Sequence, residues 1–161
     1  MKKELNVLIV LALIWCMGFV AAPLVSHSLL SKVLYRFFSV VCHQFGSRSF
    51  HLHGEPFAVC IRCTSIYAGF LTSLLFVRYS AQLRSKKFDT AALLLICSLP
   101  MVFDGFASLL NLRDSTMLSR IVTGLLFGVG MALLMHQSLT EITHTLLTTK
   151  IKRLWTRNQI S

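Results

Sequence analysis

Long apolar segments alternate with shorter polar ones along the chain. The apolar segments cover residues 6–25, 57–79, 90–112 and 119–139. The hydrocarbon core of a bilayer is about 30 Å thick and is crossed by about 20 mostly apolar helical residues, so each segment is long enough to span it. The apolar positions are continuous, which favours helices over the alternating strands of a barrel. The pattern predicts an all-α polytopic membrane protein with four transmembrane helices.

The composition supports the same class of protein. Of the 161 residues, 55% are hydrophobic and 14% are charged, and the mean hydropathy is +0.68. These values are too apolar for an ordinary soluble domain. We expect residues 1–161 to form a single membrane domain.

Basic residues are divided unevenly between the two sides of the predicted bundle. The side that holds the termini carries Lys2, Lys3, Arg78, Arg84, Lys86, Lys87, Lys150, Lys152, Arg153 and Arg157. The other side carries Lys32, Arg36, Arg48, Arg113 and Arg120. Lys and Arg are retained in the cytoplasm, which predicts a multi-pass protein of the inner membrane with both termini cytoplasmic. The net charge of +10 follows from this topology, so nucleic-acid binding is not expected.

The first apolar segment also has features of a cleavable secretory signal. Lys2 and Lys3 precede it, and Val20, Ala21 and Ala22 imitate a cleavage site. However, the apolar stretch is long for a signal core, and Glu4 lies among the basic residues. Both a retained and a cleaved first segment stay open.

An amphipathic segment begins the predicted outer loop of residues 26–56. Within residues 29–41, apolar side chains occupy positions 30, 33, 34, 37, 38 and 41, which is helical spacing. The opposite side of this helix carries Ser28, Lys32, Arg36 and Ser39. Such a helix either lies in the membrane interface with its basic face toward lipid phosphates or caps the bundle.

The outer loop also concentrates side chains that bind metals. The loop contains Gly46, Gly54 and Pro56, which interrupt regular structure and allow it to fold back. Thiolates and imidazoles suit zinc, copper(I) or iron, and three cysteines with one histidine form a known tetrahedral zinc site. We therefore predict a transition-metal site, with zinc preferred, formed by Cys42, His43, Cys60 and Cys63.

Other interpretations of these cysteines stay open. His51 and His53 are alternative ligands. A disulfide or redox pair suits an oxidising outer face, and unligated buried cysteines are also common.

Ionisable residues are expected at the same depth as the cysteines. Asp104 falls in the outer half of the third segment, Arg120 begins the fourth, and Arg62 stands between Cys60 and Cys63. A carboxylate inside the membrane is costly unless it is paired. One interpretation is a pocket for a membrane lipid or another anionic ligand, lined by Arg62, Asp104, Asn111, Arg113 and Arg120. The alternative is a structural Asp–Arg pair between helices.

The sequence does not decide whether this pocket catalyses a reaction. If it does, the candidate catalytic residues are Asp104, Arg62 and Tyr67.

Gly124 and Gly128, four residues apart, predict a close contact between helices. Residues 141–161 are predicted to form a basic, partly helical cytoplasmic tail on anionic lipid.

Five motifs mark a known family. They are Cys42-His43-Gln44, Arg48-Ser49-Phe50, Cys60-Ile61-Arg62-Cys63-Thr64-Ser65-Ile66-Tyr67-Ala68-Gly69, Asp104-Gly105 and Arg120-Ile121-Val122-Thr123-Gly124. This set resembles a domain-of-unknown-function family of small predicted membrane proteins from bacteria and archaea. The resemblance covers most of the chain, which departs from the pattern chiefly at Ser65, where glycine is usual. It implies a shared site, with no assigned activity.

The chain is also similar, more weakly, to quinone-linked membrane oxidoreductases that generate disulfides. Those enzymes are four-helix bundles with a Cys-x-x-Cys pair at the outer end of a helix, which implies a quinone cofactor and a redox role for Cys60 and Cys63. They carry a second cysteine pair, and the segment 111–118 contains none, so Cys42 would have to replace it. A non-catalytic membrane scaffold, acting with a protein partner or as a homo-oligomer, is the third possibility.

Overall fold

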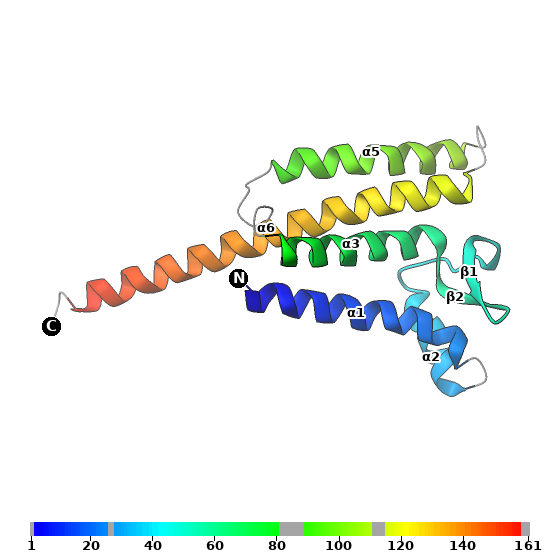
Figure 1. Ribbon diagram of the computed structural model, residues 1–161, viewed down its shortest axis with the longest axis horizontal. Helices are drawn as coiled ribbons and strands as arrows, with labels where there is room; N and C mark the ends of the chain where they lie inside the picture. Colours follow the sequence, from blue (N-terminus) through cyan, green and yellow to red (C-terminus); the bar gives the residue numbers. More distant parts are fainter. Residues whose placement is uncertain (1, 26–27, 81–88, 111–114, 159–161) are drawn as a thin grey trace.

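The computed structural model describes residues 2–25, 28–80, 89–110 and 115–158 (Figure 1). Its helices are α1 (Lys2–Leu24), α2 (Leu29–Phe38), α3 (Ile61–Tyr79), α5 (Thr90–Leu109) and α6 (Met117–Asn158). A single turn of 3₁₀ helix, η1 (Gly46–Arg48), precedes the strands β1 (Ser49–Leu52) and β2 (Glu55–Cys60). The long helices lie side by side in the order α1, α3, α6 and α5, with α2 and the strands at one end (Figure 1).

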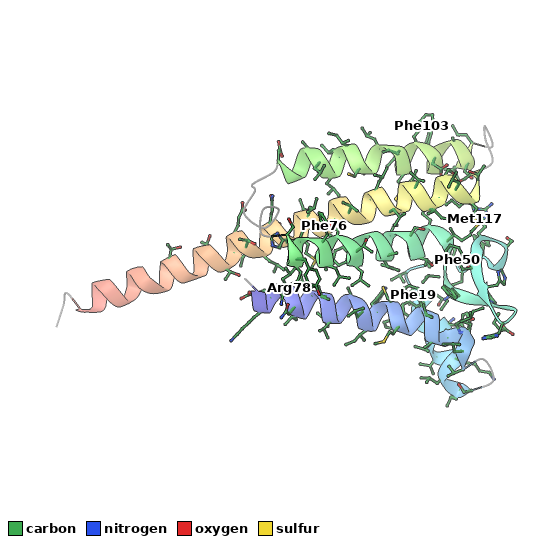
Figure 2. The ribbon with its side chains drawn as sticks, viewed as in Figure 1. Phe19, Phe50, Phe76, Arg78, Phe103 and Met117 are labelled. Carbon is green, nitrogen blue, oxygen red and sulfur yellow. The ribbon has the colours of Figure 1, made fainter. Side chains whose placement is uncertain are left out.

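Three helices are long and apolar enough to cross a membrane. They are α1 at Lys3–Leu24, α5 at Ala92–Leu109 and α6 at Met117–Thr143. The prediction of a mostly helical chain with membrane-spanning helices is confirmed to this extent. Large apolar side chains such as Phe103, which is 76% exposed, point outward from α5, as expected of a helix that faces lipid (Figure 2).

The second apolar segment is shorter in the structure than the sequence predicts. The helix begins at Ile61 rather than at residue 57, because residues 57–60 belong to β2. β2 pairs antiparallel with β1 through a two-residue turn at His53 and Gly54, whose φ angles are 53° and 86°. Positive φ at both turn residues matches the twist of a tight hairpin. The predicted all-α fold is therefore corrected by this small sheet.

The predicted close contact between helices is confirmed between α3 and α6. A Cβ added at Gly128 would lie 2.2 Å from the carbonyl oxygen of Ile66, and one at Gly124 would lie 2.8 Å from that of Arg62. In return, a Cβ added at Gly69 of α3 would lie 2.5 Å from the carbonyl oxygen of Leu125. The two helices thus touch backbone to backbone.

A cap, formed by α2 and the β1–β2 hairpin, is joined to α1 by an aromatic core. Phe38 of α2 is 2% exposed and packs edge-on against Trp15 and Phe19 of α1. The Gln44 amide donates 2.7 Å hydrogen bonds to the carbonyl oxygens of Tyr35 and Ala58, linking α2 to β2. The cap therefore has a fixed position at the C-terminal end of α1 and the N-terminal end of α3.

The amphipathic helix predicted within residues 29–41 is present as α2. Its Ser31 and Phe38 are buried toward α1 and the hairpin. Leu30, Val33 and Phe37 are each more than half exposed on another side. Both predicted uses of the helix, capping the bundle and resting in the interface, are compatible with these faces.

α6 is longer than the predicted fourth segment. It runs over 42 residues, which at about 1.5 Å per residue is about twice the thickness of the hydrocarbon core. Its C-terminal half extends beyond the other helices (Figure 1). The predicted, partly helical tail of residues 141–161 is helical as far as Asn158.

We predict that Gly128→Ala lowers the free energy of unfolding by about 1–3 kcal/mol, because the added methyl group must push α3 and α6 apart. Thermal unfolding of the detergent-solubilised protein, followed by circular dichroism, measures the change. Gly46→Ala is the control, since nothing lies within 4 Å of a Cβ added at Gly46. Equal stability of the two variants would contradict the backbone contact.

Candidate metal site and arginine–aspartate network

Three cysteines from separate parts of the chain meet at the N-terminal end of α3. Cys42 follows α2, Cys60 ends β2, and Cys63 lies in the first turn of α3. Their sulfur atoms all lie within 4.8 Å of one another. The backbone N–H of Cys60 donates a 3.2 Å hydrogen bond to the sulfur of Cys42. This bond holds Cys42 next to the residue that precedes α3.

The surroundings of Cys42 favour its thiolate form. Hydrogen bonds from the thiols of Cys60 and Cys63 lower its pKa well below the ordinary value, and backbone N–H groups of Cys60 and Gln44 add to the effect. Burial of Cys42, which is 6% exposed, acts in the opposite direction but is outweighed. The thiolate is the form that binds metals and attacks disulfides.

The spacing of the sulfurs fits a transition metal. A zinc ion binds thiolates at about 2.3 Å in tetrahedral geometry, which places two sulfurs about 3.8 Å apart. Atoms already within 4.8 Å of one another need only small side-chain rotations to reach that arrangement. The three-cysteine group thus could hold a metal ion, and it leaves one coordination position for a further ligand.

The structure does not bring the predicted fourth ligand to the sulfurs. The His43 side chain is exposed and stacks on Phe45, with ring centroids 6.1 Å apart and planes 4° apart. His51 and His53 are also exposed, on the hairpin. Ligation by a histidine therefore stays a prediction.

A cavity of about 240 Å³, here called the inner cavity, lies beside the three cysteines. Its wall combines soft sulfur ligands with cationic side chains. The residues that line it are Val41, Cys42, His43, Gln44, Phe45, Arg48, Cys60, Arg62, Cys63, Ser108 and Arg120. A small ligand in this space would touch the sulfur cluster and the arginines together.

Asp104 has a charged partner, as predicted from the sequence. Arg62 of α3 forms an ion pair with Asp104 of α5, and the two side chains are 25% and 14% exposed. The carboxylate also accepts hydrogen bonds from Ser115 at 2.7 Å and Ser119 at 2.8 Å. Arg120 donates through Nε to the Ser115 hydroxyl at 3.1 Å. This network joins α3, α5 and α6 next to the cysteines.

The remaining predicted site residues lie elsewhere. Tyr67 is half-buried among Trp15 and Phe19 on the α1 side of α3, where it lines an apolar groove rather than the inner cavity. Asn111 and Arg113 lie outside the described residues.

Sequence reasoning missed the roles of Arg48, Ser115 and Ser119. The spacing of the two serines was an available signal, because residues four apart near a helix start share one face.

These features define a class: an integral membrane protein with a thiol cluster and a buried ion pair at one end of its helices. Residues 42–134 match the model of a family of predicted membrane proteins, DUF2085. The chain belongs to this family, as the resemblance found in its sequence suggested. The matched segment contains Cys42, Cys60, Cys63, Arg62 and Asp104.

Two archaeal relatives agree with this assignment. The chain is 32% identical to an uncharacterized protein of Methanocaldococcus jannaschii over 136 residues, which are 80% of this chain and 87% of the relative. It is 37% identical to an uncharacterized protein of Methanothermobacter thermautotrophicus over 102 residues, which are 60% of this chain and 86% of the relative. No solved structure gives a significant match.

We predict that the effects of Arg62→Gln and Asp104→Asn on stability are not additive. Each change leaves a partly buried charge without its partner. The double variant should therefore lose less free energy of unfolding than the two single losses added together, by about 0.5–3 kcal/mol. Reversible unfolding in mixed micelles measures all members of the cycle. Additive losses would show that the ion pair does not couple α3 to α5.

Proposed function

We propose that this protein is a multi-pass inner-membrane metal protein that handles a lipid or another anionic ligand at its outer face. The metal, zinc first, is held by Cys42, Cys60 and Cys63. The observation that carries this proposal is the convergence of three sulfurs, from the segment after α2, from β2 and from α3, beside a cavity lined by arginines.

The arrangement of the helices supports four membrane spans. α3 lies between α1 and α6, so it shares the layer that these two helices cross. The N-terminus and the long C-terminal half of α6 lie at the same end of the bundle, opposite the hairpin (Figure 1). With four spans both termini are cytoplasmic, in agreement with the basic residues at that end.

The proposed role of the metal is to hold the cap over the pocket. When bound, it supplies a positive centre with an open coordination position, as in catalytic zinc sites. The cysteines then link the end of α2 and the end of β2 to the first turn of α3. Arg62 and Asp104 sit directly below this link, on the membrane side of the cap.

Asp104 acts in this proposal as the counter-ion of Arg62. Its oxygens accept hydrogen bonds from one guanidinium and two hydroxyl groups. A carboxylate held by several donors is stabilised in its charged form. The pair thus keeps the guanidinium fixed beside the inner cavity while the membrane surrounds it.

We predict about one metal ion per chain in protein purified in detergent without chelator, measured by inductively coupled plasma mass spectrometry. Cys42→Ser, Cys60→Ser and Cys63→Ser should each remove most of it, because two thiolates bind zinc far more weakly than three. Cys16→Ser and Cys97→Ser are matched controls, since neither residue belongs to the cluster. Chelator should expose three further thiols to titration.

A different result would favour the redox alternative. The sulfurs of Cys60 and Cys63 are close enough for a small movement to bring them toward bonding. A protein without metal, with a Cys60–Cys63 disulfide and with co-purifying quinone, would overturn the metal site and support the thiol–quinone oxidoreductase.

We predict that a green fluorescent protein fused after Ser161 is fluorescent in cells, whereas alkaline phosphatase fused after His53 is active. Four spans place the C-terminus in the cytoplasm and the hairpin outside, and each reporter works on only one side. A fluorescent hairpin fusion or an active C-terminal phosphatase would exclude this topology. If α3 did not cross, the two ends of the chain would lie on opposite sides.

A further inference from the structure

A second cavity, here called the outer cavity, lies between the hairpin and the start of α6. It is open to the surface, has a volume of about 620 Å³ and is bordered by hydroxyl groups, an imidazole and two guanidinium groups. Phe50 of β1 and Met117 of α6 lie at this end of the bundle (Figure 2). The residues that line it are Ser47, Arg48, Ser49, Phe50, His51, Ile61, Ser115, Met117 and Arg120.

Arg48 and Arg120 line both cavities. They therefore stand between the outer cavity, under the hairpin, and the inner cavity, beside the cysteines. Arg48 comes from η1 in the cap, and Arg120 comes from the first turn of α6. Positive charge from two separate elements thus belongs to the walls of both cavities.

Unlike Arg62, these two arginines have no carboxylate partner among the described residues. Among the described residues, neither Arg48 nor Arg120 forms an ion pair with a carboxylate, whereas Arg62 is paired with Asp104. The Arg48 guanidinium lies 5.6 Å from the centre of the Phe45 ring, and Arg120 donates to the Ser115 hydroxyl. The charges of Arg48 and Arg62 repel that of Arg120, and the charge of Asp104 attracts it.

An anion between the arginines would remove this repulsion. Guanidinium groups bind phosphate-type oxyanions through paired, charge-assisted hydrogen bonds. Arg62 also lines the inner cavity, where its ion pair with Asp104 holds the guanidinium in place.

We propose that Arg48 and Arg120 form an oxyanion site, specific for a phosphate-type group, that connects the outer cavity to the inner cavity beside the cysteines. The inference rests on the proposed function, because it names the class of its anionic ligand. The phosphate belongs either to a lipid head group or to a free solute. Both sources present the same phosphate-type group to the arginines.

The experiment uses the full-length protein in detergent with two kinds of probe. Radiolabelled inorganic phosphate is measured by equilibrium dialysis. Phosphatidic acid is compared with diacylglycerol of the same acyl chains by native mass spectrometry, so that the two lipids differ only in the phosphate group. We expect saturable binding of inorganic phosphate, of phosphatidic acid over diacylglycerol, or of both, and the pattern identifies the source of the phosphate.

The variants Arg48→Gln and Arg120→Gln should each weaken that binding about tenfold, as the loss of one charge-assisted hydrogen bond predicts. Arg48→Lys should recover only part of it, because an ammonium lacks the paired donors of guanidinium. Arg36→Gln is the matched control, since Arg36 is exposed on α2 and lines neither cavity. It should leave the affinity unchanged.

Failure of the site and failure of the metal proposal are separable. Metal content and the midpoint of thermal unfolding are measured for every variant, and Arg48→Lys reports on the site if Arg48→Gln does not fold. If the metal-loaded wild type neither binds inorganic phosphate saturably nor prefers phosphatidic acid to diacylglycerol, the oxyanion site alone is overturned. An equal loss of binding in Arg36→Gln would overturn it too. Phosphate binding without metal would support the oxyanion site and count against the metal.

Discussion

The backbone contact between α3 and α6 determines where the other parts of the site lie. Gly124 and Gly128 of α6 leave no room for side chains against the turns of α3 that begin at Arg62 and Ile66. This contact sets the first turn of α6, with Ser119 and Arg120, beside the first turn of α3. Because α5 packs on α6, Asp104 is carried to Arg62, and the ion pair forms next to Cys63.

The cap packs against these helices and supplies the rest of the cysteine cluster. Two of the three sulfurs come from the cap, and only Cys63 belongs to a long helix. The aromatic core around Phe38 fixes the cap on α1, and the Gln44 hydrogen bonds join α2 to β2 within the cap, before any metal is considered. A metal at the sulfurs would therefore connect two structures that are each already ordered, the helix bundle and the cap.

Much of this architecture can be read from the sequence, and the exceptions have physical causes. Length and apolar continuity predicted α1, α5 and α6, and the cost of a carboxylate in the membrane predicted a partner for Asp104. α3 is not among the three helices that are apolar enough to cross a membrane, because Arg62, Arg78 and its serine and threonine residues lower its hydropathy; Ser65 and Ser73 are buried in protein. The hairpin was missed because its turn uses His53 at positive φ, where asparagine or glycine is the usual signal.

The sequence predicted that the cysteines of the candidate site lie together, but it did not predict the residues around them. The cysteines could be grouped because the loop between Cys42 and Cys60 had to fold back to the same membrane face. Arg48 could not be placed in this way, since its position depends on η1 and on the hairpin that the pattern did not reveal.

We propose that one metal ion is bound by Cys42, Cys60 and Cys63. X-ray absorption at the zinc edge of the purified protein measures the ligands of that ion. We expect three sulfur neighbours at about 2.3 Å and one lighter ligand. A spectrum fitted by nitrogen and oxygen neighbours alone would contradict it.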